Sequence, residues 1–533
     1  MSFALTFLKP LYAHGRHLDA AASMQAGIAS LMLMEHAGFA VAQAARQMAP
    51  SCLHWMIICG TGHNGGDGMV AARLLSRMPN TRVSVLLLGQ PEQLPADSLA
   101  NWNRLDWEPT VQTIIEPDIH EWACDIFNAS GVIDAIFGVG LNRPVEAPFS
   151  SWIEAINRRK GQGVLAIDMP SGVCSKTGQI LGCAVQAERT LTLATGKPGL
   201  YLSGGKFQAA HLSTADIGIP EAILKQFPPD LWVITDTWVN HRLPQPAPSA
   251  HKGNRGHVMV IGGSRAMPGA PQLSAMAALT SGCGLVSLAM AEAAYDTTAA
   301  LWPELMHIPW NSCDLQQACQ TLSQVISERP PQAIVLGPGL GEHADALVSA
   351  LLAILRRTSK TPLILDADAL NALAKLSDSV RLPNHVILTP HIGEAARLLQ
   401  CCKQEILMDL PKAAQRLQTR WGGVIVLKSA TTVVALSSAD VVVNPTGACV
   451  LATAGSGDVL AGVIASFAAQ GCAPDDAALI GSYLHGRAGE MVAEKMSGYG
   501  VRAKYVIEML PKALAHSKAL TPRQGLENQA SYR

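Results

Sequence analysis

The chain has 533 residues, which is too long for one ordinary hydrophobic core, so we expect at least two domains. Its formal net charge is −1 and only 15% of its residues are charged, which argues against nucleic acid or an anionic membrane as its main partner. The twelve cysteines show no CxxC spacing, and the first residues lack a basic segment followed by an apolar core. We therefore expect reduced thiols, no spanning helix and a cytoplasmic protein.

The first part of the chain predicts a strand, a glycine loop and a helix. Helical periodicity covers Asp19–Met48, and the first β-like segment is His54–Cys59. Residues 60–68 (GTGHNGGDG) follow, and a helical pattern covers Met69–Met78. This order is typical of a dinucleotide or phosphate site. A plain NAD dehydrogenase is disfavoured, because the acid expected late in the second strand is absent from Val83–Gln90.

Polar residues follow several of the next predicted strands. The strand-like segment Asp125–Ile133 leads to Asp134, and Val164–Ile167 leads to Asp168 and Ser171. The other predicted elements are a helix at Phe149–Lys160 and strands at Thr190–Ala194 and His211–Thr214. Turn chemistry can explain each polar residue alone. Polar residues at the carboxyl ends of parallel strands, however, point into the crevice where α/β sheets bind ligands, so the set predicts a binding site.

The segments CGTGHNGGDG, IDAIFGVGLNR and LAIDMPSG together resemble the NAD(P)H-hydrate epimerase domain over about residues 10–220. The resemblance implies that the substrate is held by His63, Asn64, Gly65, Gly66, Asp67, Gly138, Val139, Gly140, Leu141, Asn142, Arg143, Pro144 and Asp168. It also implies that Asp168 moves the proton and that a potassium ion lies among Asn64, Asp134 and Ser171. The family loop has Asn where this chain has His63, which keeps a donor but adds a titratable group.

The second half of the chain predicts another α/β sheet. Residues 226–256 are rich in proline and predict a linker. Beyond it, a helix is predicted at Gln272–Ser281, and each of five predicted strands is followed by a loop: Val258–Ile261, Ala333–Leu336, Pro362–Leu365, His385–Leu388 and Val424–Leu427. Repeated strand-then-loop units describe a doubly wound sheet with its site along one edge.

A glycine loop in this half opens a helix. Gly455-Ser456-Gly457-Asp458 follows the β-rich segment Thr431–Val443 and precedes an apolar helical pattern. Free backbone N–H groups at a helix start, backed by the helix dipole, form a site for a phosphate or an oxyanion. Asp458 then stands where a base can take a proton from a hydroxyl that faces the phosphate. A tight turn with a surface acid would explain the motif alone.

The ordered segments HKGNRG, GGS…PGA, GPGLG, DADALNAL, TPHIGE, VLKSATT and GSGD resemble the ADP/ATP-dependent NAD(P)H-hydrate dehydratases, which are ribokinase-like, over about residues 235–510. The resemblance implies that Ala270, Gly341, His391 and Asp458 contact the hydrated nucleotide, with Asp458 as the base. It implies an adenine-nucleotide site, with Mg²⁺ on the donor phosphates, at Lys428, Ser429, Ala430, Thr431, Thr432 and Gly457. Ser429 stands where the family commonly has Gly.

These observations predict a two-domain α/β enzyme, with a Rossmann-like three-layer sandwich at residues 1–225, a ribokinase-like domain at 257–515 and a polar tail at 516–533. The resemblance implies that it epimerises NAD(P)HX, the C6 hydrate of NAD(P)H, dehydrates the S epimer with ADP as the preferred donor, and forms a homo-oligomer. Two alternatives stay open. One is a ribokinase-class small-molecule kinase with an N-terminal sensor, and the other is a catalytically inactive N-terminal binding or oligomerisation module.

Overall fold

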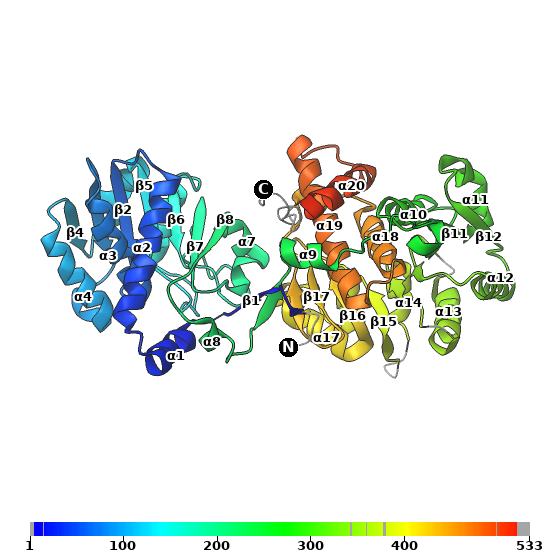
Figure 1. Ribbon diagram of the computed structural model, residues 1–533. Helices are drawn as coiled ribbons and strands as arrows, with labels where there is room; N and C mark the ends of the chain where they lie inside the picture. Colours follow the sequence, from blue (N-terminus) through cyan, green and yellow to red (C-terminus); the bar gives the residue numbers. More distant parts are fainter. Residues whose placement is uncertain are drawn as a thin grey trace, which may run out of the picture. The chain divides into compact units, whose positions relative to one another are not determined.

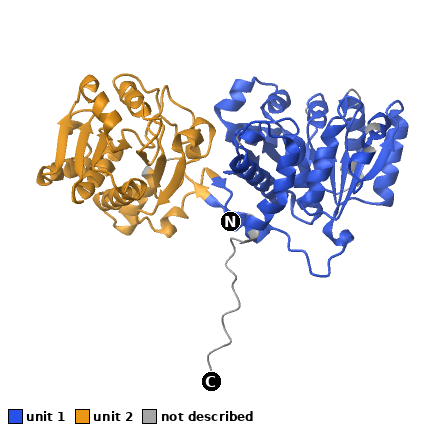
Figure 2. Ribbon diagram, turned by 90° about the horizontal axis from the view of Figure 1, so that it is seen from above, with its two compact units in different colours: residues 1–9, 232–533 blue, residues 10–231 orange. Residues whose placement is uncertain are grey.

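A computed structural model describes residues 5–13, 15–341, 344–358, 360–376, 380–496 and 498–519. The chain divides into two compact units, one of residues 10–231 and one of residues 1–9 with 232–533 (Figure 2). Each unit is built on its own β-sheet (Figure 1). Of the tail expected from residue 516, residues 516–519 end a helix and residues 520–533 lie outside the described residues.

The unit of residues 10–231 contains an all-parallel sheet of seven strands in the order β4-β3-β2-β5-β6-β7-β8. Its strands are β2 (His54–Cys59), β3 (Arg82–Leu87), β4 (Val111–Ile115), β5 (Gly131–Ala135), β6 (Val164–Ile167), β7 (Arg189–Leu193) and β8 (His211–Ala215). Its helices are α1 (Arg16–Ala26), α2 (Ser30–Met48), α3 (His63–Ser76), α4 (Ala96–Arg104), α5 (Ile119–Asn128), α6 (Phe149–Asn157), α7 (Ser203–Ala209) and α8 (Glu221–Leu224).

Helices cover both faces of this sheet, because its central strands are apolar on both sides. Along β2, Trp55 and Ile57 pack in the core that α2, α3 and α4 cover, whereas Met56 and Ile58 pack in the core that α5 and α6 cover. The predicted three-layer sandwich is therefore confirmed. It aligns the carboxyl ends of β2, β5, β6 and β7 along one edge, where the loops that follow them can meet.

Two element predictions in this unit were wrong. The predicted helix after the first glycine loop begins at His63, not at Met69, so the HNGGDG segment forms the first turns of α3. Glycine is tolerated there because the helix start packs closely: a Cβ on Gly65 would lie 2.1 Å from the carbonyl oxygen of Gly60. The segment Asp125–Ile133 is not one strand but the end of α5 and the start of β5, so Asp134 lies within β5.

The second sheet has eleven strands in the order β1-β9-β18-β17-β16-β15-β14-β13-β10-β11-β12. Its strands are β1 (Lys9–Leu11), β9 (Leu231–Val233), β10 (His257–Ile261), β11 (Leu285–Ala291), β12 (Met306–Trp310), β13 (Ala333–Leu336), β14 (Leu363–Leu365), β15 (Leu382–Leu388), β16 (Gly422–Leu427), β17 (Val433–Ala435) and β18 (Val441–Val443). The run from β16 to β12 is parallel, whereas β17 pairs antiparallel with both β16 and β18.

The helices of the other unit are α9 (Asp236–Arg242), α10 (Gly269–Thr280), α11 (Glu292–Thr298), α12 (Leu315–Glu328), α13 (Ala344–Thr358), α14 (Asp368–Leu373), α15 (Ile392–Leu399), α16 (Lys403–Met408), α17 (Leu410–Trp421), α18 (Ser456–Ala469), α19 (Pro474–Lys495) and α20 (Ala503–Ala519). α10, α18, α19 and α20 share one large core with alternate residues of the strands. α10 and α18 approach closely, since a Cβ on Gly462 would lie 2.0 Å from the carbonyl oxygen of Ser274. The predicted doubly wound sheet is confirmed.

The proline-rich segment 226–256 contains β9 and α9, and α9 begins with a side-chain cap from Thr235 to the backbone N–H of Trp238. Residues from the start of the chain belong to the same core: Leu5 and Leu8 are buried with Trp232 and Trp238. Among the described residues, no helix is long and apolar enough to cross a membrane.

Candidate active sites

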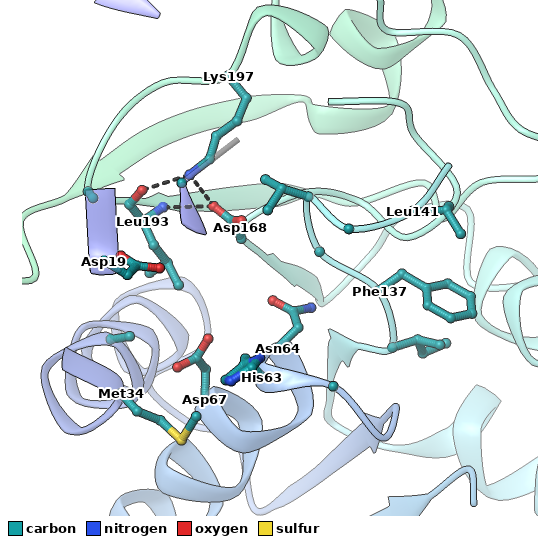
Figure 3. Close-up of a pocket in the computed structure, with 18 of the residues that line it drawn as sticks. Asp19, Met34, His63, Asn64, Asp67, Phe137, Leu141, Asp168, Leu193 and Lys197 are labelled. Carbon is teal, nitrogen blue, oxygen red and sulfur yellow. Dashed lines mark hydrogen bonds and ion pairs between the residues drawn. The ribbon is translucent and has the colours of Figure 1, made fainter. Parts of the chain in front are cut away.

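A cavity of about 690 Å³ lies within the unit of residues 10–231 (Figure 3). Its walls come from α1, α2, the start of α3 and the loops that follow β5, β6 and β7. Ten of the residues predicted to hold a substrate line it, namely His63, Asn64, Asp67, Gly138, Val139, Gly140, Leu141, Asn142, Arg143 and Asp168. Gly65, Gly66 and Pro144 are not among the lining residues, and the two glycines pack against protein atoms instead.

Asp168 follows β6 and has a φ of +63°, a conformation that costs energy for a side chain other than glycine. Its Oδ1 atom accepts hydrogen bonds from Lys197 Nζ, from Thr192 Oγ1 at 3.2 Å and from the Leu193 N–H at 3.1 Å. Lys197, whose side chain is only 3% exposed, also donates to the Leu193 carbonyl at 2.7 Å. The strained backbone and the three donors fix the Asp168 carboxylate in one orientation at the cavity wall (Figure 3).

Two further carboxyl groups line this cavity. Burial raises the pKa of Asp67 well above its usual value, and the charges of Asp168 and Asp19 add to the effect while Lys197 opposes it. Burial also raises the pKa of Asp19, which Lys197 and His63 act to lower. The cavity therefore combines one lysine with three carboxyl groups that interact electrically, which is the setting in which carboxyl groups take different protonation states.

Asp134 and Ser171 meet at the end of β5, and Asn64 lies against the turn that follows it. Asp134 accepts hydrogen bonds from the Ser171 N–H at 2.8 Å and from Ser171 Oγ at 2.6 Å. Ser171 Oγ also accepts from the Phe137 N–H at 2.8 Å. Asn64 lies against the next residue of that turn, because a Cβ on Gly138 would be 3.3 Å from Asn64 Oδ1.

This group of residues offers oxygen ligands to a cation. Burial raises the pKa of Asp134 to about 6, although its hydrogen bonds with Ser171 oppose the shift. In the part of the chain that the structure describes, no basic side chain forms an ion pair with Asp134. A buried carboxylate beside amide and hydroxyl oxygens suits a hard cation, which prefers oxygen ligands.

The second candidate site lies at the carboxyl ends of β14, β15 and β16. Lys428, directly after β16, donates to Asp366 Oδ1 at 2.8 Å, and Thr389 Oγ1 donates to the same oxygen at 2.8 Å. Burial acts to lower the pKa of Lys428, but the carboxylates of Asp366, Glu394 and Asp458 raise it overall. The lysine is therefore held as a cation among carboxyl groups.

Asp458 lies in the first turn of α18, one residue beyond Gly457. Burial, with the nearby Asp366, raises the pKa of Asp458 to about 7, although Lys428 opposes the shift. A Cβ on Gly457 would lie 3.1 Å from Lys428 Nζ, so the glycine leaves the lysine access to the helix start. Ser274 of α10 donates to the Asp458 carbonyl at 2.8 Å and so fixes this turn from the side.

The other predicted contacts of this half surround the same edge of the sheet. His391 caps α15 through Nδ1, and Glu394 accepts from the His391 N–H at 2.8 Å. The Lys428 N–H donates to the Pro390 carbonyl, which places His391 beside the lysine. The Gly341 N–H donates to Asp368 at 2.9 Å. Ala270 lies in the first turn of α10 near the GPGLG loop, and Ser429, Ala430, Thr431 and Thr432 form the turn between β16 and β17.

Sequence reasoning missed Lys197, Asp19 and Glu394 as members of these sites. Lys197 stands in a TGKPG segment just after a strand, so the pattern of a polar residue at a strand end could have found it. Asp19 lies in α1, far along the sequence from the glycine loops, and no local pattern marks it. Glu394 is buried, which raises its pKa to about 7. Its sequence context indicates only a helix-capping residue.

Comparisons with known proteins agree with this organisation. The family of NAD(P)H-hydrate dehydratases matches residues 258–512, and the family described as the YjeF-related protein N-terminus matches residues 30–199. The bifunctional NAD(P)H-hydrate repair enzyme Nnr of Moorella thermoacetica is 36% identical over 93% of this chain and 94% of its own length. The chain belongs to this family. Its assignment from the sequence motifs is therefore confirmed.

Other members show the same coverage. The Nnr of Vibrio cholerae is 34% identical over 92% of this chain and 94% of its own length. Among solved structures, the ADP/ATP-dependent NAD(P)H-hydrate dehydratase of Bacillus subtilis, co-crystallised with ATP and Mg²⁺, is 29% identical. It covers 54% of this chain and 99% of its own, with a TM-score of 0.48. Both halves of this chain match a family model, and each half carries a candidate site.

Proposed function

We propose that this chain repairs hydrated NAD(P)H through two reactions. The unit of residues 10–231 interconverts the R and S hydrates at C6, and the other unit dehydrates the S hydrate to NAD(P)H. Family membership supports this proposal, and so does one observation: each unit carries a lysine paired with a buried aspartate at the carboxyl ends of its parallel strands, beside a carboxyl group of raised pKa.

In the epimerase reaction, Asp168 exchanges protons with the substrate. Its Oδ1 is occupied by Lys197, Thr192 and Leu193, which leaves Oδ2 for the substrate. The loop of residues 138–143 and the start of α3 form the cavity walls that hold the nucleotide. Asn64, Asp134 and Ser171 would hold a potassium ion, whose charge, when bound, offsets that of the buried Asp134 carboxylate and of a substrate phosphate.

In the dehydratase reaction, Asp458 takes the proton of the 6-hydroxyl while the hydroxyl oxygen attacks the terminal phosphoryl group of the nucleotide. The backbone N–H groups at the start of α18 stabilise the charge on the transferring group. Lys428 reaches the same turn and faces the phosphates, and the turn of residues 428–432 contacts the rest of the nucleotide. Mg²⁺ bound with the nucleotide would neutralise part of the charge of the donor phosphates beside Lys428 and the start of α18.

Phosphate is a better leaving group than hydroxide. The phosphorylated C6 oxygen departs as phosphate, pushed by the lone pair of the ring nitrogen, and loss of a proton from C5 restores the ring double bond. We propose ADP as the donor, because the order of the fused domains resembles that of bacterial relatives, which generally use ADP. Ser429, which stands where the resemblance indicates Gly, adds a side chain to the turn that contacts the nucleotide.

A mixed R/S NADHX preparation tests this proposal. The near-ultraviolet absorbance of reduced nicotinamide is followed with ADP, with ATP and with neither nucleotide. Complete recovery that requires a nucleotide would support both reactions, and the better nucleotide identifies the donor. Recovery that stops at the S fraction would overturn the epimerase half. Formation of a stable phosphorylated product without NADH would instead favour a small-molecule kinase of the ribokinase class.

A further inference from the structure

The two carboxylate oxygens of Asp168 have different surroundings. Its Oδ1 accepts three hydrogen bonds, one of them from the buried Lys197 cation, whereas Oδ2 accepts none from the described residues. These three donors hold one carboxylate oxygen in place, the charged one most strongly, and leave the other oxygen free to accept a proton. Asp168 therefore suits the role of base. Exchanging a hydroxyl group at C6 also needs an acid, because hydroxide leaves poorly.

Asp67 has the features of that acid. It reaches the cavity from α3, whereas Asp168 reaches it from the loop after β6 (Figure 3). The residue is only 9% exposed, yet its carboxyl group accepts no hydrogen bond and forms no ion pair within the described ranges. A buried carboxyl group without a partner is costly as an anion, so it favours the protonated form and can donate its proton to a bound substrate.

We infer that Asp67 is the second catalytic carboxyl group of the epimerase: it protonates the departing 6-hydroxyl, while Asp168, held by the positioning residue Lys197, accepts a proton from the incoming water. This inference rests on the proposed epimerase function. It assigns the two opposite proton transfers of the reaction to two carboxyl groups whose surroundings differ, which is how enzymes separate an acid from a base of the same residue type.

The proton balance of the step is complete. Asp67 gives its proton to the 6-hydroxyl oxygen, the C6–O bond breaks with its electron pair on oxygen, and the ring nitrogen lone pair forms a C=N bond as water leaves. A water molecule on the opposite face then adds to C6 and gives a proton to Asp168 Oδ2. The configuration at C6 is inverted, and one proton has moved from Asp67 to Asp168. Its return through water between the carboxyl groups resets the enzyme.

The charged groups around Asp67 determine how the reaction depends on pH. Asp19 faces it from α1, Asp168 from the loop after β6 and Lys197 from the loop after β7, and the first two raise its pKa while Lys197 lowers it. Burial raises the pKa of the Cys59 thiol of β2, and the charges of Asp134 of β5 and of Asp67 add to this effect. Glu35 of α2 forms an ion pair with Arg73 of α3. Because Asp67 must be protonated to act, epimerisation falls as the pH rises through its raised pKa.

The full-length Asp67→Asn variant tests this assignment with a single purified epimer of NADHX, the appearance of the other epimer being measured by chromatography. Asn keeps the size of the side chain but carries no acidic proton, so we expect epimerisation to fall about 10²–10⁴-fold. We also expect the alkaline limb of the kcat/KM profile to disappear from the residual activity. The matched control is Asp106→Asn, because Asp106 is exposed and does not line the cavity.

A second pair of variants tests the positioning role of Lys197. Lys197→Met leaves Asp168 without its charged donor, so kcat for epimerisation should fall with little change in KM, and Lys197→Arg should restore part of kcat. If Lys197 had only a structural role, Lys197→Met would change kcat and KM together and Lys197→Arg would not restore kcat.

The inference is overturned if Asp67→Asn keeps the wild-type rate or keeps the alkaline limb, or if Asp19→Asn removes that limb instead. Failure of this inference is distinguishable from failure of the proposed function, because only the latter predicts that the wild-type enzyme does not interconvert the epimers.

Discussion

Both compact units pair a lysine with a buried aspartate at the carboxyl ends of parallel strands, but they use the pair differently. In the unit of residues 10–231, Lys197 binds Asp168, the carboxylate that faces the cavity. In the other unit, Lys428 binds Asp366, which Thr389 also holds, and the proposed base Asp458 stays outside the ion pair. The comparison indicates that an ion pair can hold the reactive group itself, or can hold a neighbour and leave the reactive group with a raised pKa.

The largest expected effect separates the two reactions. Asp458→Asn removes the proposed base of the dehydratase, so the rate of S-NADHX dehydration should fall by about 10²–10⁴-fold. Interconversion of the epimers, measured by chromatography without nucleotide, should stay at the wild-type rate, because Asp458 belongs to the other compact unit. Equal loss of both activities would show that the two sites are not independent.

The second effect concerns the stability of the Lys428–Asp366 pair. Asp366 has a side chain only 2% exposed, so Lys428→Met leaves a buried carboxylate without its cation. Loss of one partner of a buried pair costs about 3–5 kcal/mol of the free energy of unfolding. Thermal denaturation of the full chain measures the loss. The control is Lys375→Met, whose partner Asp345 is 55% exposed and whose removal should cost about 0–1 kcal/mol.

A smaller effect is expected at the start of α3. A Cβ on Gly65 would lie 2.1 Å from the Gly60 carbonyl oxygen, so Gly65→Ala should destabilise its unit by about 1–3 kcal/mol through overpacking. In the control Gly62→Ala, the new Cβ meets no atom within 4 Å. A urea titration of both variants compares them. Equal midpoints would mean that α3 shifts freely and that the close approach is not required.

The smallest effect is the pH dependence of the dehydratase. Asp458 must be ionised to act as a base, and its pKa is raised to about 7 by burial and by Asp366. The value of kcat/KM for S-NADHX should therefore rise with pH up to about 7 and then level off, losing about tenfold for each pH unit below it. If the kcat/KM profile instead levelled off near the ordinary pKa of an aspartate, burial would not control the protonation of Asp458.

Much of the fold could be predicted from the sequence, because buried parallel strands are short apolar runs that end in turn residues. β2, β6 and β13 have the predicted bounds. The prediction failed where apolar residues were compatible with either state, as in the segment that became the end of α5 and the start of β5. The glycine-rich start of α3 was also not predicted as helix, because close packing rather than helix propensity stabilises it.

The two sites were predictable to different degrees. Residues in strand-end loops, such as Asp168 and Lys428, carry a local signal, because parallel strands bring their carboxyl ends together. The environment of each group was not predictable. The partner of Asp168 is Lys197, and the neighbours that act on Asp67 come from α1 and from the loops after β6 and β7. Only the three-dimensional arrangement shows which carboxyl groups are paired and which are isolated.

The path of the chain between the two units has a consequence for dissecting the protein. Residues 1–9 and 232–533 form one unit, so residues 10–231 are inserted in sequence within it. Phe7 stacks on His241 with ring centroids 4.5 Å apart, and Thr235 Oγ1 donates to the Phe7 carbonyl at 2.8 Å. A fragment that begins after residue 231 therefore lacks the edge strand beside β9 and exposes apolar surface that Leu5 and Leu8 cover. During synthesis, Leu5 and Leu8 are made before the residues that they pack against, because the whole inserted unit is translated in between.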